Sequence, residues 1–388
     1  LSGQIAALST LALTFIARPL GAILFGHFGD RFGRKNTFVI SLLVMGVSTM
    51  VIGLLPTYDS IGIWATLLLC LCRIGQGIGL GGEWGGAALV AIENAPEGKR
   101  GWYGTFPQLG APLGLLLANG AFLLITDILG SAAMTDWAWR IPFLSSSILV
   151  VIGLYVRLKL AEAPIFVTAL DKPQPKTLPM VEVIITHFKP FFLGMLICIA
   201  GYVLFYIIIA FSQIYAKSAP SQSEAGYAMG LGFSPQIFTA LLMYSAVSLA
   251  ISITISGKCI DKIGRRIWLI WTTVAVAIFG LALPYFLENG TTVSLFWFLI
   301  IGMGLIGMGY GPLSSFLPEL FPTHVRYTGA SLTYNIAGLF GASVAAIIAL
   351  PLNANYGLKG VGIYLTLNAV LSLIGLWFIT ETRDRQLL

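Results

Sequence analysis

Charge is scarce in this sequence. Of its 388 residues, 10% are Asp, Glu, Lys or Arg, whereas a soluble domain carries about 25%. With 57% hydrophobic residues and a mean hydropathy of +0.88, the chain lacks the polar surface that water requires. This composition excludes a soluble globular protein and makes the lipid bilayer the main solvent. We expect no nucleic-acid partner, because the net charge of +6 is spread over loops.

Other absences narrow the function further. The four cysteines, Cys70, Cys72, Cys198 and Cys259, show neither a disulfide framework nor a zinc-binding spacing, so we expect no metal site. The sequence holds no Gly-x4-Gly-Lys-Ser/Thr loop, which excludes an ATP-driven pump. We expect neither a cofactor nor an enzymatic activity. No signal peptide is visible, and the sequence begins inside an apolar run.

Apolar runs long enough to cross a bilayer, roughly 20 residues each, dominate the sequence. They are continuously apolar and do not alternate as barrel strands do, which predicts an all-α membrane protein. The eleven predicted spans are Ile5–Phe28, Thr37–Pro56, Ile63–Ile92, Trp102–Ile125, Trp139–Leu158, Phe191–Ile214, Ile237–Ser256, Ile267–Leu287, Val293–Leu320, Thr328–Leu352 and Val361–Thr380.

The basic residues fix the predicted orientation. Seventeen of the 22 lysines and arginines fall in one set of alternate loops, and the positive-inside rule places these loops in the cytoplasm. We therefore expect a multi-pass protein of the cytoplasmic (inner) membrane, with the basic loops and the C-terminus inside. The longest basic loop predicts a linker at 161–188, between an N-terminal bundle of five spans at 1–160 and a C-terminal bundle of six at 189–388.

Polar signatures recur in the two halves, which indicates an internal repeat. Gly26-His-Phe-Gly-Asp-Arg-Phe-Gly-Arg-Lys35 follows the first span, and Gly257-Lys-Cys-Ile-Asp-Lys-Ile-Gly-Arg-Arg266 follows the seventh with identical spacing. The third and ninth spans each end in Glu, with Pro three and Arg seven residues further on, at Glu93 and Glu319. Glu162-Ala-Pro and Glu381-Thr-Arg close the two halves.

On these motifs the chain resembles the major facilitator superfamily, whose loop motif is present twice. The runs Phe15-Ile-Ala-Arg-Pro-Leu-Gly21, Arg73-Ile-Gly-Gln-Gly77 and Gly81-Gly-Glu-Trp-Gly-Gly86 resemble its metabolite:proton symporters. The resemblance implies two pseudo-symmetric bundles of six helices each. Because the first half has five spans here, we expect the family's first helix to be missing, and the visible spans to be helices 2–6 and 7–12.

Three charged side chains lie deep in predicted spans, where each is costly unless it is paired or hydrated. Counting about 1.5 Å per residue from the span ends predicts Arg18 and Arg73 near the midplane, at one depth. Two cations at one depth could bind an anion, and Glu83, together with Arg73, is a candidate for proton coupling. The alternative is that these residues bond to carbonyls at helix ends or form salt bridges that serve only helix packing.

The resemblance also predicts which residues face a central cavity, although polar groups in membrane helices often serve only as interhelical contacts. Together with Arg18 and Arg73, the predicted substrate-binding residues are Gln76, Gln108, Tyr202, Tyr206, Tyr310 and Asn335.

The repeated motifs predict a cytoplasmic gate. The family's crossed arrangement would place Asp30 at the N-terminus of the helix near Thr328, and Asp261 at that of the helix near Trp102, where a negative charge is favoured. Arg34 and Arg265 would then pair with Glu93 and Glu319, which would bring Arg100 and Arg326 into the same network. The gate residues are Asp30, Arg34, Glu93, Arg100, Asp261, Arg265, Glu319 and Arg326. Binding of lipid headgroups is the alternative for the basic residues.

These features predict a secondary active transporter, acting as a monomer, that moves a small organic acid or zwitterion together with a proton by alternating access. A proton/drug antiporter or a uniporter of the same fold remains an alternative, as does a receptor or scaffold built on a transporter fold.

Overall fold

The computed structural model describes residues 2–159 and 177–385, and its long elements in these ranges are all helices. Nine helical stretches among the described residues are long and apolar enough to cross a membrane. The eleven predicted spans are recovered when α1 (Ser2–Phe32) is added and the stretch Thr323–Phe378 is divided at Gly357. Gly357 turns the chain there with φ 66°, a conformation that glycine adopts readily. The prediction of an all-α membrane protein is confirmed.

The N-terminal bundle contains the five predicted spans and a short helix at the end of a loop. Its elements are α1 (Ser2–Phe32), α2 (Arg34–Leu54), α3 (Tyr58–Ile61), α4 (Ile63–Glu93), α5 (Arg100–Gln108), α6 (Gly110–Ala133), η1 (Met134–Ala138) and α7 (Arg140–Leu158). Helices α5, α6 and η1 together form one continuous candidate membrane span.

The C-terminal bundle follows the predicted linker, most of which lies outside the described residues, as does Glu162. Its elements are α9 (Pro179–Ile185), α10 (Phe188–Tyr206), η2 (Ile207–Phe211), α11 (Ser212–Lys217), α12 (Pro235–Ile263), α13 (Arg265–Glu288), α14 (Thr292–Glu319), η3 (Thr323–Val325), α15 (Arg326–Gly338), η4 (Leu339–Ser343) and α16 (Val344–Phe378). The short helix α9, at the end of the linker, packs against both α1 and α15.

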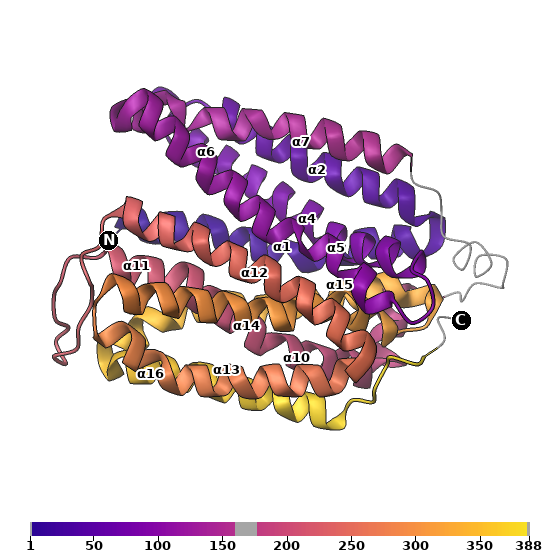
Figure 1. The fold of residues 1–388 in the computed structure, drawn as a ribbon. Helices are drawn as coiled ribbons and strands as arrows, with labels where there is room; N and C mark the ends of the chain where they lie inside the picture. The colour runs from indigo at the N-terminus through magenta and orange to yellow at the C-terminus, as the bar shows by residue number, and fades with distance from the viewer. Residues whose placement is uncertain (1, 160–176, 386–388) are drawn as a thin grey trace.

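The two copies of the loop motif form matching corners. Gly33 separates α1 from α2 with φ 122°, and Gly264 separates α12 from α13 with φ 103°. At these φ angles the backbone of any residue with a Cβ atom would be strained, which explains the glycine at the same place in both copies. Both corners lie at the same end of the molecule, on the right in Figure 1, together with the C-terminus. We call this the motif end; α1 begins at the opposite end.

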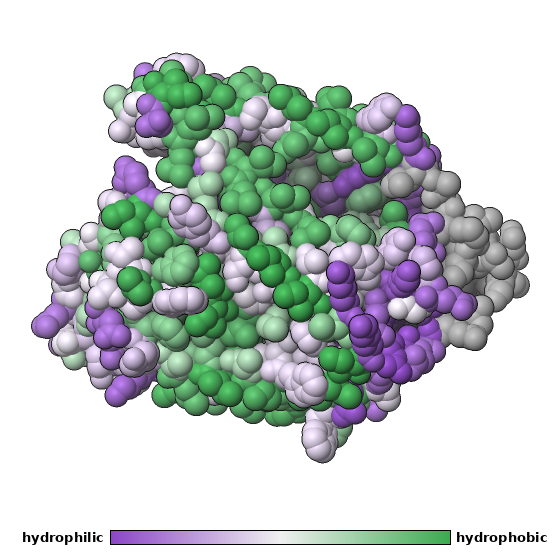
Figure 2. All heavy atoms as spheres, in the orientation of Figure 1, coloured by the Kyte–Doolittle hydropathy of each residue, from purple (hydrophilic) through white to green (hydrophobic). Residues whose placement is uncertain are grey.

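The surface has the polarity expected of a protein that spans a bilayer. Apolar residues cover the flanks of the bundles, and hydrophilic residues gather at the motif end and at the opposite tip (Figure 2). Exposed large apolar side chains occur along α2, α6, α7 and α13, for example Leu129, Ile148 and Ile278. In water such a surface would be unfavourable, whereas lipid tails solvate it.

Small residues let the two bundles cross closely near the motif end. Helix α1 packs against α15, α4 also packs against α15, and α5 packs against α12 and α14. A Cβ placed at Gly26 would lie 2.8 Å from the Cα atom of Thr328, and one placed at Gly101 would lie 2.5 Å from the carboxylate of Asp261. Such close contacts between helices are typical of membrane proteins.

Gly21 tests how much stability the α1–α4 contact contributes. A Cβ at this position would overlap the backbone of Ile78, which cannot move aside as a flexible side chain can. We expect Gly21→Ala to destabilise the protein by about 1–3 kcal/mol through overpacking. Thermal unfolding in detergent measures this. Gly114→Ala is the control, because nothing lies within 4 Å of its added methyl group, and equal midpoints for the two variants would contradict the expectation.

Candidate functional site

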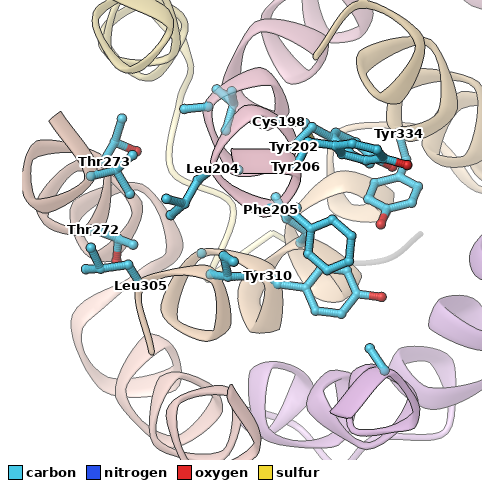
Figure 3. A pocket seen from close by; sticks show the side chains of 18 of the residues that line it. Cys198, Tyr202, Leu204, Phe205, Tyr206, Thr272, Thr273, Leu305, Tyr310 and Tyr334 are labelled. Atoms are coloured by element: carbon cyan, nitrogen blue, oxygen red, sulfur yellow. The ribbon is translucent and has the colours of Figure 1, made fainter. Parts of the chain in front are cut away.

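A cavity of about 280 Å³ lies between the bundles. Aliphatic and aromatic side chains form most of its wall. In Figure 3, Tyr202, Phe205 and Tyr206 of α10 lie on one side, with Tyr310 of α14 and Tyr334 of α15 next to them. A cavity of this composition suits a small ligand held by a few polar groups.

Arg18 of α1 is the charged residue among those that line this cavity. Its guanidinium carbon lies 4.2 Å from the ring centroid of Phe15, and Phe15 contacts Tyr206 edge-on at 5.4 Å. The Nε atom is buried without a hydrogen-bond partner. In the part of the chain that the structure describes, no carboxylate lies within ion-pair distance of Arg18. This cation is therefore available to an anionic ligand.

Aromatic rings from both bundles surround the polar part of the cavity. Trp84 of α4 stacks on Tyr334, with the ring centroids 4.0 Å apart and the planes at 9°. Tyr202 follows at 5.1 Å from Tyr334, and its buried hydroxyl has no partner. Phenol hydroxyls both donate and accept hydrogen bonds, so they can complement the carboxylate of a ligand or its hydroxyl groups.

The predicted residues Gln108 and Asn335 make contacts between the bundles. Gln108 accepts a bond from Trp84 Nε1 at 3.2 Å and donates to the Tyr310 carbonyl at 2.8 Å. Asn335 lines the cavity, but its amide donates to the carbonyl of Gly81 at 3.1 Å. Both amides thus act as interhelical contacts, the alternative that the sequence left open.

Arg73 and Gln76 are not among the residues that line this cavity. Arg73 donates to Gln76 at 3.1 Å, and Gln76 donates to Thr49 of α2 at 2.9 Å. The expectation that Arg18 and Arg73 share one depth is wrong, because the backbone of Arg18 abuts Gly81. Gly81 lies about 12 Å further along α4 than Arg73, because α1 and α4 are offset along their axes by an amount that counting residues cannot give.

Glu83 forms a salt bridge, the alternative that the sequence left open, with a partner that the sequence did not identify. Its carboxylate lies 2.5 Å from Arg157 Nη2, at the last turn of α7. The guanidinium of Arg157 also lies over the Phe38 ring at 3.6 Å and donates to the Phe38 carbonyl at 2.7 Å. The positive-inside count had assigned Arg157 to a loop, and nothing in the sequence pattern links it to a carboxylate 74 positions away.

At the motif end, Asp30 faces the N-terminus of α15. Its carboxylate accepts the backbone N–H groups of Tyr327 at 3.1 Å and Thr328 at 2.9 Å, and the Thr328 hydroxyl at 2.8 Å. Arg34 forms an ion pair with Glu93, which also pairs with Arg326 at 3.2 Å. The predicted contacts of Asp30 and of Arg34 are present.

The second copy of the motif repeats this arrangement in the other direction. Asp261 accepts the backbone N–H groups of Gly101 and Trp102 at the start of α5, both at 2.8 Å. Arg265 pairs with Glu319 at 3.1 Å. Arg100 was expected to join these ion pairs; it donates instead to the Arg385 carbonyl at 2.6 Å. Each bundle therefore supplies the carboxylate that caps a helix of the other.

Glu381 belongs to the same region, in a role that its short signature did not indicate. Its carboxylate accepts the backbone N–H groups of Arg265 and Arg266, both at 2.9 Å, and so caps α13. Burial alone would raise the pKa of the Glu381 carboxyl, but these two N–H groups and those of Arg383 and Thr382 hold it below its usual range. The carboxylate stays ionised, as a helix cap requires.

Comparisons with known proteins agree with this architecture. The chain matches the Major Facilitator Superfamily over residues 2–346. A Haemophilus influenzae protein, named as a candidate metabolite transport protein, is 88% identical over the whole chain and 87% of its own length. The Escherichia coli inner membrane metabolite transport protein YhjE is 47% identical over 98% of the chain and 85% of its own length. The E. coli proline/betaine transporter is 32% identical over 99% of the chain and 76% of its own length.

Solved structures show the same fold at low sequence identity. The proton:xylose symporter XylE bound to 6-bromo-6-deoxy-D-glucose matches with a TM-score of 0.78 at 16% identity, over 100% of this chain and 89% of that one. The inward-open conformation of XylE from E. coli matches with a TM-score of 0.69 at 18% identity, over 98% and 87%.

A cavity between two helical bundles, together with these relatives, defines a multi-pass membrane transport protein and not an enzyme. The chain belongs to the major facilitator superfamily and, within it, to the metabolite transporters.

Asp30 tests the contact between the bundles at the motif end. Asp30→Asn removes the charge that faces the α15 N-terminus and one of the accepting oxygens. We expect a loss of about 1–3 kcal/mol in stability, measured by thermal unfolding. Asp59→Asn is the control, since Asp59 is exposed on α3 at the opposite end. Identical unfolding of the two variants would show that the charge at Asp30 contributes nothing.

Proposed function

We propose that this protein is a secondary active symporter that carries a small carboxylate-bearing metabolite together with a proton by alternating access. The observation that supports this most directly is Arg18, a cation without a carboxylate partner among the described residues, in an aromatic cavity between two bundles. Its guanidinium suits a carboxylate, with which it can form two parallel hydrogen bonds. The surrounding rings suit the apolar body of an organic acid or the cationic group of a zwitterion.

We further propose that the motif end faces the cytoplasm and that the protein lies in the inner membrane as a monomer. The excess of Lys and Arg at this end supports the orientation. The name of the E. coli relative with 47% identity includes the inner membrane.

The gate that we propose consists of the residues at the motif end. Asp30 and Asp261 cap helices of the opposite bundle, and Arg34, Glu93, Arg265, Glu319 and Arg326 hold the corners around them. Arg100 contributes to the proposed gate by donating a hydrogen bond to the carbonyl of Arg385, near the C-terminus. With these contacts formed, the cytoplasmic side would be shut, which supports an outward-facing state for this arrangement. In an inward-facing state the contacts between the bundles would separate, whereas Arg34–Glu93 and Arg265–Glu319 can persist within their own bundles.

The arginines test the binding site. Arg18→Lys keeps the charge but loses the planar fork, so we expect the affinity for substrate to fall more than about ten-fold. Arg73→Lys should have a smaller effect, because Arg73 does not line the cavity in this state. Binding to purified protein, using the best ligand from a panel of labelled organic acids and zwitterions, measures both. Unchanged affinity in Arg18→Ala would exclude the proposed site.

We propose Glu83 as the proton-coupling carboxylate. It lies in a membrane-spanning helix, and its second oxygen is buried without a partner. Ionised Glu83 forms an ion pair with Arg157, whereas protonated Glu83 is neutral and cannot form it. A proton/drug antiporter or a uniporter stays the second candidate; uptake with and without an imposed pH gradient distinguishes them.

Glu83→Gln should preserve exchange of substrate across the membrane and abolish accumulation driven by a pH gradient, because the amide cannot take up a proton. Proteoliposomes loaded at two pH values measure both activities. Glu288→Gln, at the exposed end of α13, is the matched control. Accumulation at the wild-type level in Glu83→Gln would place the coupling carboxylate elsewhere.

A further inference from the structure

Four consecutive residues of α4 make four different contacts at the point where α4 crosses α15. The carbonyl of Gly81 accepts from Asn335 Nδ2 at 3.1 Å, and that of Gly82 accepts from the Tyr327 hydroxyl at 2.7 Å. Glu83 pairs with Arg157, and Trp84 stacks on Tyr334. We call Gly81–Gly86 with Tyr327–Asn335 the α4–α15 crossing.

This crossing brings three parts of the proposed mechanism into a single helical turn, about 5.4 Å in height. Glu83 carries the titratable charge, Trp84 forms part of the cavity wall, and the carbonyls of Gly81 and Gly82 hold the opposite bundle. Helix carbonyls at this position already accept bonds from their own helix. The two α15 side chains therefore make additional bonds, which can break without unfolding α4.

Side chains that surround Gly86 lie between the ion pair of Glu83 and these bonds. Arg157 lies over the Phe38 ring. That ring lies 2.8 Å from where a Cβ of Gly86 would be, and the Tyr327 hydroxyl lies 2.9 Å from the same point. The backbone N–H of Tyr327 in turn donates to Asp30. A change at Arg157 would therefore alter the packing around Tyr327, which takes part in both the crossing and the motif-end contacts.

Most charged groups on the neighbouring elements are engaged elsewhere. Arg18 of α1, whose backbone abuts Gly81, lines the cavity, and Arg326 of α15 pairs with Glu93. Asp30 of α1 and Arg34 of α2 lie beyond Tyr327, where Asp30 caps α15 and Arg34 pairs with Glu93. On α5 and α14, Arg100 and Glu319 take part in the second half of the motif-end contacts. Arg157 of α7 is thus the charge that responds directly to protonation of Glu83.

We propose that Tyr327 and Asn335 are positioning residues for coupling: they tie the turn of α4 that bears Glu83 and Trp84 to the opposite bundle. The proposal rests on the proposed function. While Glu83 is ionised, Arg157 and Phe38 are held and the crossing stays closed. Uptake of a proton by the carboxylate makes it neutral, releases Arg157, and loosens the crossing so that the motif end can open. A ligand bound in the cavity next to Trp84 and Tyr334 acts on the stack between these two rings, which belongs to the same crossing.

The test removes one hydroxyl group. Tyr327→Phe deletes the bond to Gly82 but keeps the backbone N–H that caps Asp30. We expect substrate affinity to stay within two-fold, while accumulation driven by a pH gradient falls at least five-fold. Tyr215→Phe is the matched control, because Tyr215 is equally buried and its hydroxyl has no partner. If Tyr327→Phe does not reach the membrane, Asn335→Ser removes the other donor, an amide, and accumulation driven by a pH gradient should again fall at least five-fold; affinity is not the readout for this variant, because Asn335 lines the cavity.

Opening of the motif end can be measured separately from transport. Cys198 lines the cavity, so in a variant that keeps it as the sole cysteine, an impermeant thiol reagent added at the motif end reports opening. Because the thiolate is the reacting form, each labelling rate is divided by that of a free thiol at the same pH. We expect this normalised rate to increase at low pH in this background, and Tyr327→Phe to make it high at every pH. A normalised rate that does not depend on pH before Tyr327 is changed, or the same pH dependence with Tyr327→Phe, would overturn the proposal.

A double-mutant cycle decides whether the two residues act on one element. Glu83→Gln and Tyr327→Phe together should change labelling no more than the stronger single variant. Effects that multiply would mean independent roles and refute the inference. Absence of accumulation driven by a pH gradient in the wild type would refute symport, and the labelling results would then still decide whether the crossing responds to Glu83.

Discussion

The architecture depends on the cost of leaving a charge unpaired away from water. Asp30 and Asp261 each lie just beyond the membrane-facing part of a helix and are largely buried, with exposed fractions of 1% for Asp30 and 11% for the side chain of Asp261. Each carboxylate is stabilised by N–H groups of the opposite bundle. A buried carboxylate without such donors would be strongly unfavourable. These donors explain why the two bundles meet at the motif end in this structure.

The contacts between the bundles are charged at the motif end and mixed towards the cavity. Ion pairs and helix caps form the outermost layer. Further in, the Tyr327 hydroxyl bonds Gly82, and the Trp84–Tyr334 stack lies next to the Asn335–Gly81 hydrogen bond. Polar contacts can be exchanged for water at modest net cost, whereas a continuous apolar interface between the bundles could not. An interface of this composition suits a protein whose two halves must separate and meet again.

The sequence predicted the parts of the structure that the repeat determines. Identical spacing around Asp30 and Asp261 indicated that both carboxylates serve the same purpose, and the Glu93 and Glu319 signatures indicated partners for Arg34 and Arg265. The relative depth of Arg18 and Arg73 could not be predicted, because residue counting gives a height along one helix but not the offset between helices. The Glu83–Arg157 pair was missed for a related reason: it joins α4 to α7, and periodicity within a helix carries no information on contacts between helices.

The cavity residues were predicted least accurately because a polar side chain in a membrane helix can face a ligand or a neighbouring helix. Tyr202, Tyr206 and Tyr310 line the cavity, whereas Gln108 and the amide of Asn335 bond the other bundle. The amides differ from the tyrosines in reach: a short side chain at a helix crossing meets a backbone carbonyl before it meets open space. Local sequence cannot distinguish these environments, since the partners are carbonyls that every residue possesses.

The two half-buried charges that the proposed mechanism uses are held in opposite ways. Glu83 is neutralised by Arg157 within its own bundle, while among the described residues Arg18 has the face of Phe15 beside it and no carboxylate partner. Closing the cavity around an unpaired guanidinium removes it from water without compensation, which is costly. Closing it around an arginine paired with a carboxylate avoids most of that cost. Under the proposed function, closing the cavity of the empty protein is therefore unfavourable. The substrate itself supplies the interaction that permits the transition between states.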